Sequence, residues 1–489
     1  METLKVPENG IMTCPPASLE RVPEDTPPEY SVFGSRQRAI IIAIASIIGL
    51  LSPLSSNLYT PAIPEIADNL GVSKGSINLT VTSYLVLQGI SPMLWSTIGD
   101  RVGRRPLYLT TLLVYLGACI GLSFCQSFGL MIGLRAMQAI GSSPTTSIGA
   151  GVIGDLVDSR RRGKYMGFYS ALGGFATAFG PVLGGVFAQY TGWHGIFWFL
   201  LALTGVLLLT TVLVMPETKR SIVGNGQIEC SPYWRPLFPY FDAPKQIKKV
   251  KTNHSAVSFV PIGFRLLASP EVLCCVVFTG VCYAVWQMTM VAAATLYSEK
   301  YSLQERDIGL TYISNGVGSL CGSLVTGKAL DWQYSRQMKH QNNESDTVQD
   351  KIDNIERARI VPLILPTILY IISVLGFGWA VDVRAHVSVP IILGFFIGGF
   401  DTCILAGFST LVVDLFESQA FSVTATMNLS RCLLAAGGTS FIQPLIERLG
   451  VGFAFTVCAA GCVAVCPLAA AELFRGKHWR HKRAEAQSY

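Results

Sequence analysis

Long apolar stretches alternate with short polar segments along most of this chain. Each apolar stretch has the roughly 20 residues that an α-helix needs to cross a bilayer. The pattern therefore predicts an all-α membrane protein with twelve transmembrane helices. The expected spans are 39–58, 77–98, 106–125, 129–152, 165–188, 193–215, 271–296, 307–330, 360–380, 388–412, 421–444 and 450–473.

The composition agrees with this interpretation. Half of the residues are hydrophobic and only 14% are charged, whereas a soluble protein carries roughly 25% charged residues to keep its surface hydrated. A set of soluble domains, a disordered chain and a secreted disulfide scaffold are excluded for most of the length. The 13 cysteines fall mainly in apolar stretches, without histidines at zinc-binding spacing, so we expect no metal.

Positively charged residues indicate the orientation. Lys and Arg are enriched in cytosolic loops, and most of the 37 lie in segments that are cytosolic if the N-terminus is cytosolic. The opposite loops hold Lys74, Lys300, Arg306, Arg384 and Arg448. We therefore expect both termini in the cytosol, with the plasma membrane as the location and the vacuolar membrane as the alternative.

Polar segments divide the chain into two halves of six spans. The longest interior polar stretch separates the sixth span from the seventh. We expect a disordered cytosolic tail, an N-terminal bundle, a cytosolic central loop, a C-terminal bundle that contains a second cytosolic loop, and a basic cytosolic tail. In that order they cover residues 1–38, 39–215, 216–270, 271–473 with the loop 331–359, and 474–489.

The two halves carry similar residues at corresponding places. Asp100 follows the second span and Asp331 follows the eighth, each four residues after a small residue. Asp155 ends the fourth span and Asp414 ends the tenth. Such a repeat predicts two pseudo-symmetric six-helix bundles around a site near the bilayer midplane.

The short loop between spans two and three combines an acid, glycines and arginines. Glycine suits a tight turn, and an aspartate can meet a helix N-terminus or a basic side chain. The arginines can pair with acids at neighbouring helix ends; plain anchoring by positive charge is the alternative. The expected conformational switch comprises Asp100, Arg101, Gly103, Arg104, Arg105, Asp155, Asp331 and Asp414.

This loop, Gly99-Asp100-Arg101-Val102-Gly103-Arg104-Arg105, resembles the signature loop of the major facilitator superfamily. Other motifs resemble its twelve-span drug:proton antiporter branch, especially fungal exporters of drugs, organic acids and secondary metabolites. These motifs are Arg135-x-x-Gln138-x-x-Gly141, Gly180-Pro181-x-x-Gly184-Gly185, Val413-Asp414-Leu415-Phe416 and the segment Asn428 to Leu434. The resemblance covers about residues 35–475 and implies two bundles that open alternately to each side.

Arg135 places a charge inside the fourth span, where it costs at least about 2.5 kcal/mol. Arg135, Gln138, Ser142 and Thr145 recur at helical spacing and form one polar stripe. We expect the stripe to face a central cavity, and the resemblance implies a role in proton coupling or substrate contact. The alternative is that Arg135 extends to the outer membrane interface.

The second half holds an acid and an arginine within its spans. Asp401 lies near the middle of the tenth span and Arg431 near the middle of the eleventh. The two residues can form a structural ion pair, or they can titrate or bind substrate. Asp401 is the first candidate for the coupling proton, and Asp100 is the second.

Two further groups can line the pathway or simply pack the core. Tyr283, Trp286 and Gln287 share a face of the seventh span, and Asn315 is a weaker candidate on the eighth. Small residues in the fifth span permit close helix packing, and the resemblance places them between the halves, where they favour antiport over leak. These residues are Gly180, Pro181, Gly184 and Gly185.

Taken together, these features predict a secondary active transporter that exports a small organic molecule by proton antiport. Two arginines against one acid within the spans favour an anionic or neutral substrate. No Walker glycine loop or enzyme motif occurs, so we expect neither an enzyme nor a cofactor. The expected partners are a small organic substrate, protons and the lipid bilayer. We expect the protein to be a monomer and not to bind nucleic acid. A proton-coupled importer, a non-transporting sensor and a channel are the alternatives.

Overall fold

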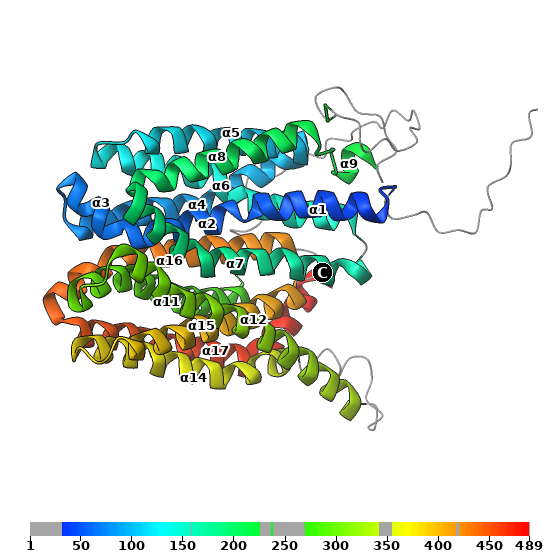
Figure 1. Cartoon of the computed structure of the whole chain (residues 1–489). Coiled ribbons are helices and arrows are strands. Elements are labelled where there is room, and N and C mark those ends of the chain that lie inside the picture. Colours follow the sequence, from blue (N-terminus) through cyan, green and yellow to red (C-terminus); the bar gives the residue numbers. More distant parts are fainter. Residues whose placement is uncertain are drawn as a thin grey trace, which may run out of the picture.

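The computed structural model describes residues 32–157, 159–224, 236–237, 269–341, 355–416 and 420–488. Every regular element in these residues is a helix (Figure 1). The first half holds α1 (Ser35–Gly49), α2 (Leu51–Tyr59), η1 (Thr60–Ala62), α3 (Ile63–Leu70), α4 (Lys74–Val102), α5 (Arg104–Ser123), α6 (Phe128–Leu156), α7 (Ser159–Thr191), α8 (Trp193–Leu213) and α9 (Arg220–Val223). The second half holds α11 (Pro270–Tyr301), α12 (Glu305–Gln341), α14 (Ile355–Asp382), α15 (Ser388–Leu415), α16 (Ala420–Leu449) and α17 (Val451–Ser488).

The first span is longer and more broken than its apolar stretch predicts. Four consecutive helical pieces, α1, α2, η1 and α3, replace the single helix expected over 39–58. Pro61 and Pro64 lie at the starts of η1 and α3, where the missing N–H of proline is tolerated. Gly71 then ends α3 with a φ of 62°, which glycine adopts without strain.

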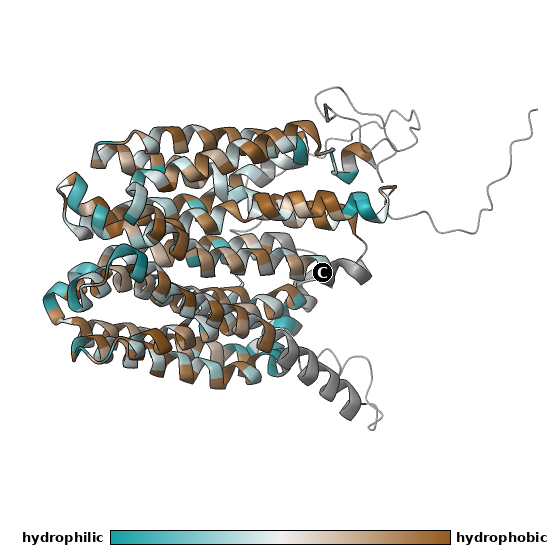
Figure 2. Cartoon of the chain, in the orientation of Figure 1, coloured by the Kyte–Doolittle hydropathy of each residue, from teal (hydrophilic) through white to brown (hydrophobic). Residues whose placement is uncertain are grey.

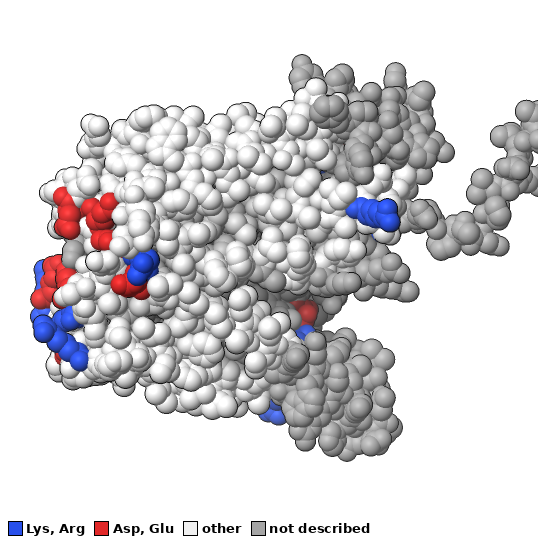
Figure 3. All heavy atoms as spheres, viewed as in Figure 1, with Lys and Arg blue, Asp and Glu red and all other residues white. Residues whose placement is uncertain are grey.

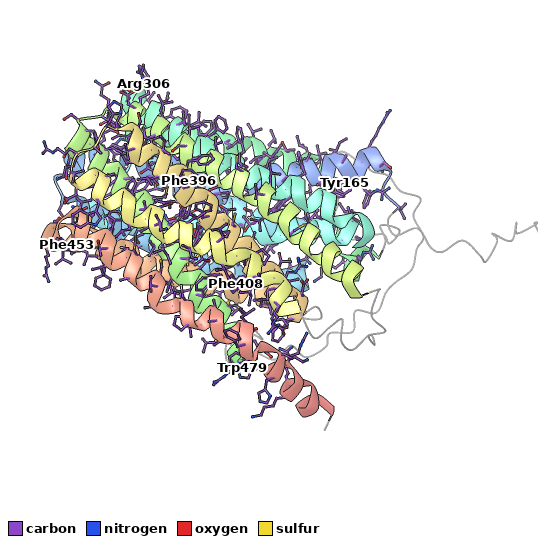
Figure 4. All side chains as sticks on the ribbon, turned by 90° about the horizontal axis from the view of Figure 1, so that it is seen from below. Tyr165, Arg306, Phe396, Phe408, Phe453 and Trp479 are labelled. Carbon is purple, nitrogen blue, oxygen red and sulfur yellow. The ribbon has the colours of Figure 1, made fainter. Side chains whose placement is uncertain are left out.

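Apolar side chains cover the outside of the helical body. Nine of the described helices are long and apolar enough to cross a membrane. Hydrophobic residues extend along the helices, and the charged side chains seen in this view gather at the two ends (Figures 2 and 3). Phe396 and Phe453 are 40% and 61% exposed, whereas Phe408 is buried (Figure 4). An apolar exterior of this extent fits a surface that faces lipid.

Three long helices are outside that group, namely α4, α6 and α16. They are less apolar because they carry polar residues, and α4 packs against both of the others. The stripe on α6 is buried from Arg135 to Thr145. With these three, the described helices match the twelve spans expected from the sequence.

The helices form two bundles, each around its own hydrophobic core. One core runs from Phe33 to Met215 and includes a few side chains of α11 and α16, and the other runs from Val272 to Cys462. In Figure 1, α7 and α16 run between the two sets of helices. The two cores lie in the first and second halves of the chain, and the division into residues 39–215 and 271–473 stays a prediction.

Several expected tails and loops fall largely outside the described residues. Residues 1–31 of the N-terminal tail, most of the central loop 216–270, and residues 342–354 of the second loop belong to this group. The segment 474–489 is described almost completely, and it continues α17 as a helix through Ser488.

Helix pair α7 and α12 joins the two bundles. A methyl group added at Gly316 would overlap Ala178, and one at Gly185 would overlap the backbone of Glu305. The two helices therefore approach so closely at these positions that no side chain fits between them, and the contact depends on glycine.

Helix pair α4 and α16 joins the bundles on the other side of the interface. The Thr82 and Ser440 hydroxyl groups are hydrogen-bonded at 2.9 Å. At the same end of the molecule, η1 and α3 of the first half contact α11 and α12. Gly327, further along α12, has no atom within 4 Å of an added methyl group. The bundles are therefore packed together at the end that carries α3.

Candidate functional site

Arg135 points into the interior of the first bundle. Its side chain is 1% exposed. Nη1 donates a hydrogen bond to Gln138 Oε1 at 2.7 Å and lies 3.5 Å from the Ser55 carbonyl oxygen. The guanidinium lies over the rings of Tyr59 and Tyr84, 4.0 and 4.6 Å from their centroids. The alternative interpretation required Arg135 to extend to the outer membrane interface. Its side chain is instead buried inside the bundle.

Hydroxyl groups on neighbouring helices fix the two tyrosines around Arg135. The Tyr59 hydroxyl is hydrogen-bonded to Thr80 Oγ1 at 2.6 Å. The Tyr84 hydroxyl is hydrogen-bonded to Ser142 Oγ at 3.0 Å. Because α2, α4 and α6 all contribute, the guanidinium is held in one position before any ligand arrives, and such a buried network is rigid when its groups are satisfied.

No carboxylate among the described residues balances the charge of Arg135. Its partners are an amide, a backbone carbonyl and two aromatic rings, and its Nε is buried without a hydrogen-bond partner. An unpaired buried cation is destabilising unless an anion meets it. A guanidinium presents its donors in a fork that matches a carboxylate, so this site can bind a carboxylate of a substrate.

Arg431 lies at the interface between the bundles. Its Nη2 and Nε lie 2.9 and 3.2 Å from Asn428 Oδ1, and its guanidinium lies 4.8 Å from the centroid of the Tyr283 ring. Asn428 Nδ2 lies 3.4 Å from the carbonyl oxygen of Gln88 on α4. A second arginine is thus held where the two halves meet.

Asp401 is buried in α15, and its side chain is 4% exposed. No hydrogen bond reaches its Oδ1. In the described parts of the chain no ion pair joins Asp401 to Arg431, although Arg431 is near enough to attract the carboxylate. The ion pair between Asp401 and Arg431, one of the two possibilities that the sequence left open, is therefore not formed in this conformation. Both side chains can still bind other partners.

The four remaining pathway candidates fall into two groups. Tyr283 and Trp286 lie with ring centroids 5.3 Å apart, and Trp286 Nε1 is buried without a hydrogen-bond partner. Gln287 is buried beside them on α11. Asn315 instead donates a hydrogen bond from Nδ2 to the Gly394 carbonyl oxygen at 3.0 Å, and this contact joins α12 to α15 in the second bundle.

The loop between α4 and α5 is tied to α6. Gly103 has a φ of 107°, which glycine tolerates, and it turns the chain directly into α5. Arg104 Nε lies 3.2 Å from Asp155 Oδ2 in an ion pair. Arg105 Nη2 donates a hydrogen bond to the Val212 carbonyl oxygen at 2.9 Å. Three expected switch residues have side chains outside the described part of the structure: Asp100, Arg101 and Asp331.

Glu217, which is not among the expected switch residues, completes this cluster. The carboxylate is 3% exposed and accepts hydrogen bonds from the backbone N–H groups of Arg104 at 2.8 Å and Arg105 at 3.1 Å. It thereby satisfies the first N–H groups of α5, which have no partner within the helix. An acid directly after the sixth span, two residues before Lys219, was the available signal.

The second half repeats part of this arrangement. Arg359 Nη2 on α14 lies 2.9 Å from Asp414 Oδ2 on α15, as Arg104 on α5 pairs with Asp155 on α6. The correspondence between Asp155 and Asp414 therefore extends to their basic partners.

The glycine motif of α7 faces both bundles. Gly180 and Gly184 leave no room for a methyl group against α2. Gly185 packs against the start of α12, and the Pro181 carbonyl oxygen would lie 2.5 Å from a methyl group at Gly309. The motif therefore connects the first span of one half to the eighth span of the other.

Two helical bundles that meet at glycine-rich helix pairs, with buried charges between apolar outer surfaces, define a membrane transporter of the alternating-access type. The sequence model described as Major Facilitator Superfamily matches residues 45–439, and the chain belongs to this superfamily. Family membership confirms the resemblance seen in the sequence motifs and the expected fold. It also identifies the chain as a transporter rather than an enzyme. The protein is thus a multi-pass membrane protein that carries small organic molecules.

Curated relatives match over nearly the whole chain. The "Citrate exporter 1" of Aspergillus niger is 35% identical over 97% of this chain and 93% of that protein. The "MFS-type transporter tstD" of Talaromyces stipitatus is 33% identical over 93% and 85%. The "Multidrug transporter QDR2" of Candida glabrata is 31% identical over 90% and 81%.

Solved structures share the fold at low sequence identity. A bacterial homologue of the human lysosomal transporter Spinster, captured inward-facing and unoccupied, has a TM-score of 0.59 and 13% identity, and covers 91% of this chain and 94% of its own. The nucleoside transporter NupG has a TM-score of 0.60 and 14% identity, with coverage of 89% and 100%.

Proposed function

We propose that this chain exports a small organic anion that carries a carboxylate, by proton antiport across the plasma membrane. The observation that carries the proposal is Arg135, a buried guanidinium that no carboxylate of the described chain neutralises. A substrate carboxylate supplies the missing charge. Arg431, half-buried at the interface, is placed to meet a second acidic group or the same one as the bundles move.

The relatives support export of this class of molecule. One is named a citrate exporter, and another is named an "MFS antiporter" from Candida albicans, 31% identical over 90% of this chain. The relative named a multidrug transporter favours a second candidate class, neutral drug-like molecules, for which the Tyr283 and Trp286 rings supply an apolar wall.

In the proposed cycle both termini face the cytosol and the chain acts as a monomer. The end that carries α3 is then the outer end, so the described conformation is closed to the outside. A cytosolic anion binds Arg135, the bundles rock, and the anion leaves on the outer side. Asp401 takes up the proton that returns, because a neutral acid is more stable than a carboxylate when buried.

Arg135→Lys tests the substrate contact. Lysine keeps the charge but loses the fork of donors, and one hydrogen bond to a charged group contributes about 1.5–3 kcal/mol. We expect the concentration of citrate that half-saturates transport in proteoliposomes to rise about 10- to 150-fold, at about 1.4 kcal/mol per tenfold change.

Arg384→Lys, an equivalent substitution in an exposed loop, is the matched control and should leave the half-saturating concentration unchanged. An unchanged value in Arg135→Lys as well would remove Arg135 from anion binding. A drop in protein yield alone would indicate a structural role.

A further inference from the structure

Glu472 is the most deeply buried acid in the described chain, and its carboxylate makes no hydrogen bond. Its side chain is 0% exposed, and both carboxylate oxygens are buried without a hydrogen-bond partner. It lies near the middle of α17, two turns before Trp479. This place is at the end of the second bundle where α11 and α14 begin. Figure 4 labels Trp479 toward the end of that helix opposite to Phe453.

Two further buried acids share this place, and each has its own cation. Glu271 in the first turn of α11 is paired with Arg483 at 2.5 Å, and Glu356 in the first turn of α14 lies 3.5 Å from Arg480. Both glutamates are 2–3% exposed. With two arginines already matched to two carboxylates, Glu472 is the third acid without a counter-charge.

Glu472 is directed at this cluster. A methyl group at Gly476 would lie 2.9 Å from Glu472 Oε1 and 3.0 Å from Glu356 Cγ, so the two side chains flank the same turn of α17. Glu472 interacts electrostatically with titratable groups on three helices. They are Glu271, Cys274 and Cys275 of α11, Glu356 of α14, and Arg480 and Arg483 of α17.

The first bundle shows how hydrogen-bond donors hold an acid at the corresponding place. Glu217 follows the sixth span and lies at the start of α5, as Glu472 in the twelfth span lies at the start of α14. Glu217 accepts hydrogen bonds from the backbone N–H groups of Arg104 and Arg105, and also of Lys219 at 2.9 Å. Glu472 has no such donors, so the two repeats differ in how this acid is held.

We infer that Glu472 is a proton-binding site, separate from the substrate pathway, and that its proton keeps the end of α17 docked on α11 and α14. An ionised carboxylate without donors or counter-charge is far less stable in such a place than the neutral acid. A metal ion does not fit, because the described residues contain no group of three or more His, Cys, Asp or Glu side chains that could hold one.

Loss of the proton leaves one uncompensated negative charge in the cluster. Arg480 and Arg483 are then drawn toward Glu472 and away from Glu356 and Glu271, and removal of a partner from a buried ion pair is strongly destabilising. The end of α17 therefore loosens as the pH rises on its side of the membrane. In the proposed orientation this side is the cytosol, so Glu472 makes the transporter responsive to cytosolic pH.

Infrared spectroscopy of the purified protein tests the proton directly. The carbonyl stretch of a protonated carboxyl group should be present in the wild type and lose one component in Glu472→Gln. Glu447→Gln, which alters an exposed glutamate on α16 that accepts a hydrogen bond from Gln443, is the control and should leave that component in place. Identical spectra for the wild type and Glu472→Gln would overturn the inference.

Thermal stability gives a second measurement that does not depend on transport. Glutamine mimics the neutral acid, so Glu472→Gln should fold. The wild type should lose stability from mildly acidic to mildly alkaline pH, because the folded state binds a proton that the unfolded state has released. This slope should be smaller in Glu472→Gln. A variant that fails to fold, or that keeps the full slope, would overturn the inference.

Discussion

Gly316→Ala should open the end of the molecule that carries α3. A methyl group at Gly316 overlaps the backbone and side chain of Ala178 on α7, and this contact exists only while the bundles are packed together at that end. The substitution therefore destabilises the described conformation and leaves a conformation with separated bundles unaffected. The equilibrium between the two conformations should shift toward outward opening.

The size of the shift follows from the overlap. Extra methyl groups in a well-packed interface cost about 1–3 kcal/mol, which corresponds to about a 5- to 150-fold change in the ratio of the two states. Alanine also improves the intrinsic stability of a helix, but this gain is the same in both conformations and cancels. Gly327→Ala, in the same helix with open space beside it, provides the control.

Electron–electron double resonance can measure this shift. Spin labels at Asp68 on α3 and Arg306 on α12, both exposed, report the separation of the bundles at the closed end. We expect a longer-distance population to grow in Gly316→Ala and to stay unchanged in Gly327→Ala. Unchanged distances in Gly316→Ala, or an equal change in the control, would refute the assignment of the α7 and α12 contact as a closed gate.

Two further substitutions test other parts of the molecule. Glu217→Gln should lower the free energy of unfolding by about 1–3 kcal/mol, because it weakens charge-assisted hydrogen bonds to the start of α5; thermal denaturation measures this, and a stability equal to that of Glu447→Gln would contradict it. Asp401→Asn should abolish the dependence of transport on the pH gradient while substrate exchange continues, as vesicle flux assays can show. Transport that is still driven by the pH gradient would exclude Asp401 from coupling.

The spans were predictable because lipid imposes a length and a hydrophobicity on each helix. The pattern located α4, α6 and α16 even though their polar residues make them less apolar than the other helices. It did not reveal that helical turns continue beyond the first apolar stretch in η1 and α3, since Pro61 and Pro64 lie there and act on the chain that follows. The corresponding positions of Asp155 and Asp414 were visible because an internal repeat places equivalent residues at equivalent helix ends.

Contacts between distant helices were not predictable in the same way. Asp401 and Arg431 were both located correctly within their spans, but the rotation of α15 and α16 decides whether they meet, and this rotation depends on packing. Glu217 and Glu472 were missed because each lies at the end of an apolar stretch, where an acid looks like a surface residue. Their burial results from the starts of α5 and α14, which lie more than 100 residues away in the chain.

In the proposed antiport, an organic anion moves in one direction across the membrane while protons move in the other. Purified protein in sealed vesicles, with labelled citrate on both sides at equal concentration, allows a direct measurement after a proton gradient is imposed. The account predicts that citrate accumulates on the side with the higher proton concentration and that collapse of the gradient stops the accumulation. Citrate that remains equally distributed, or that accumulates on the side with the lower proton concentration, would contradict it.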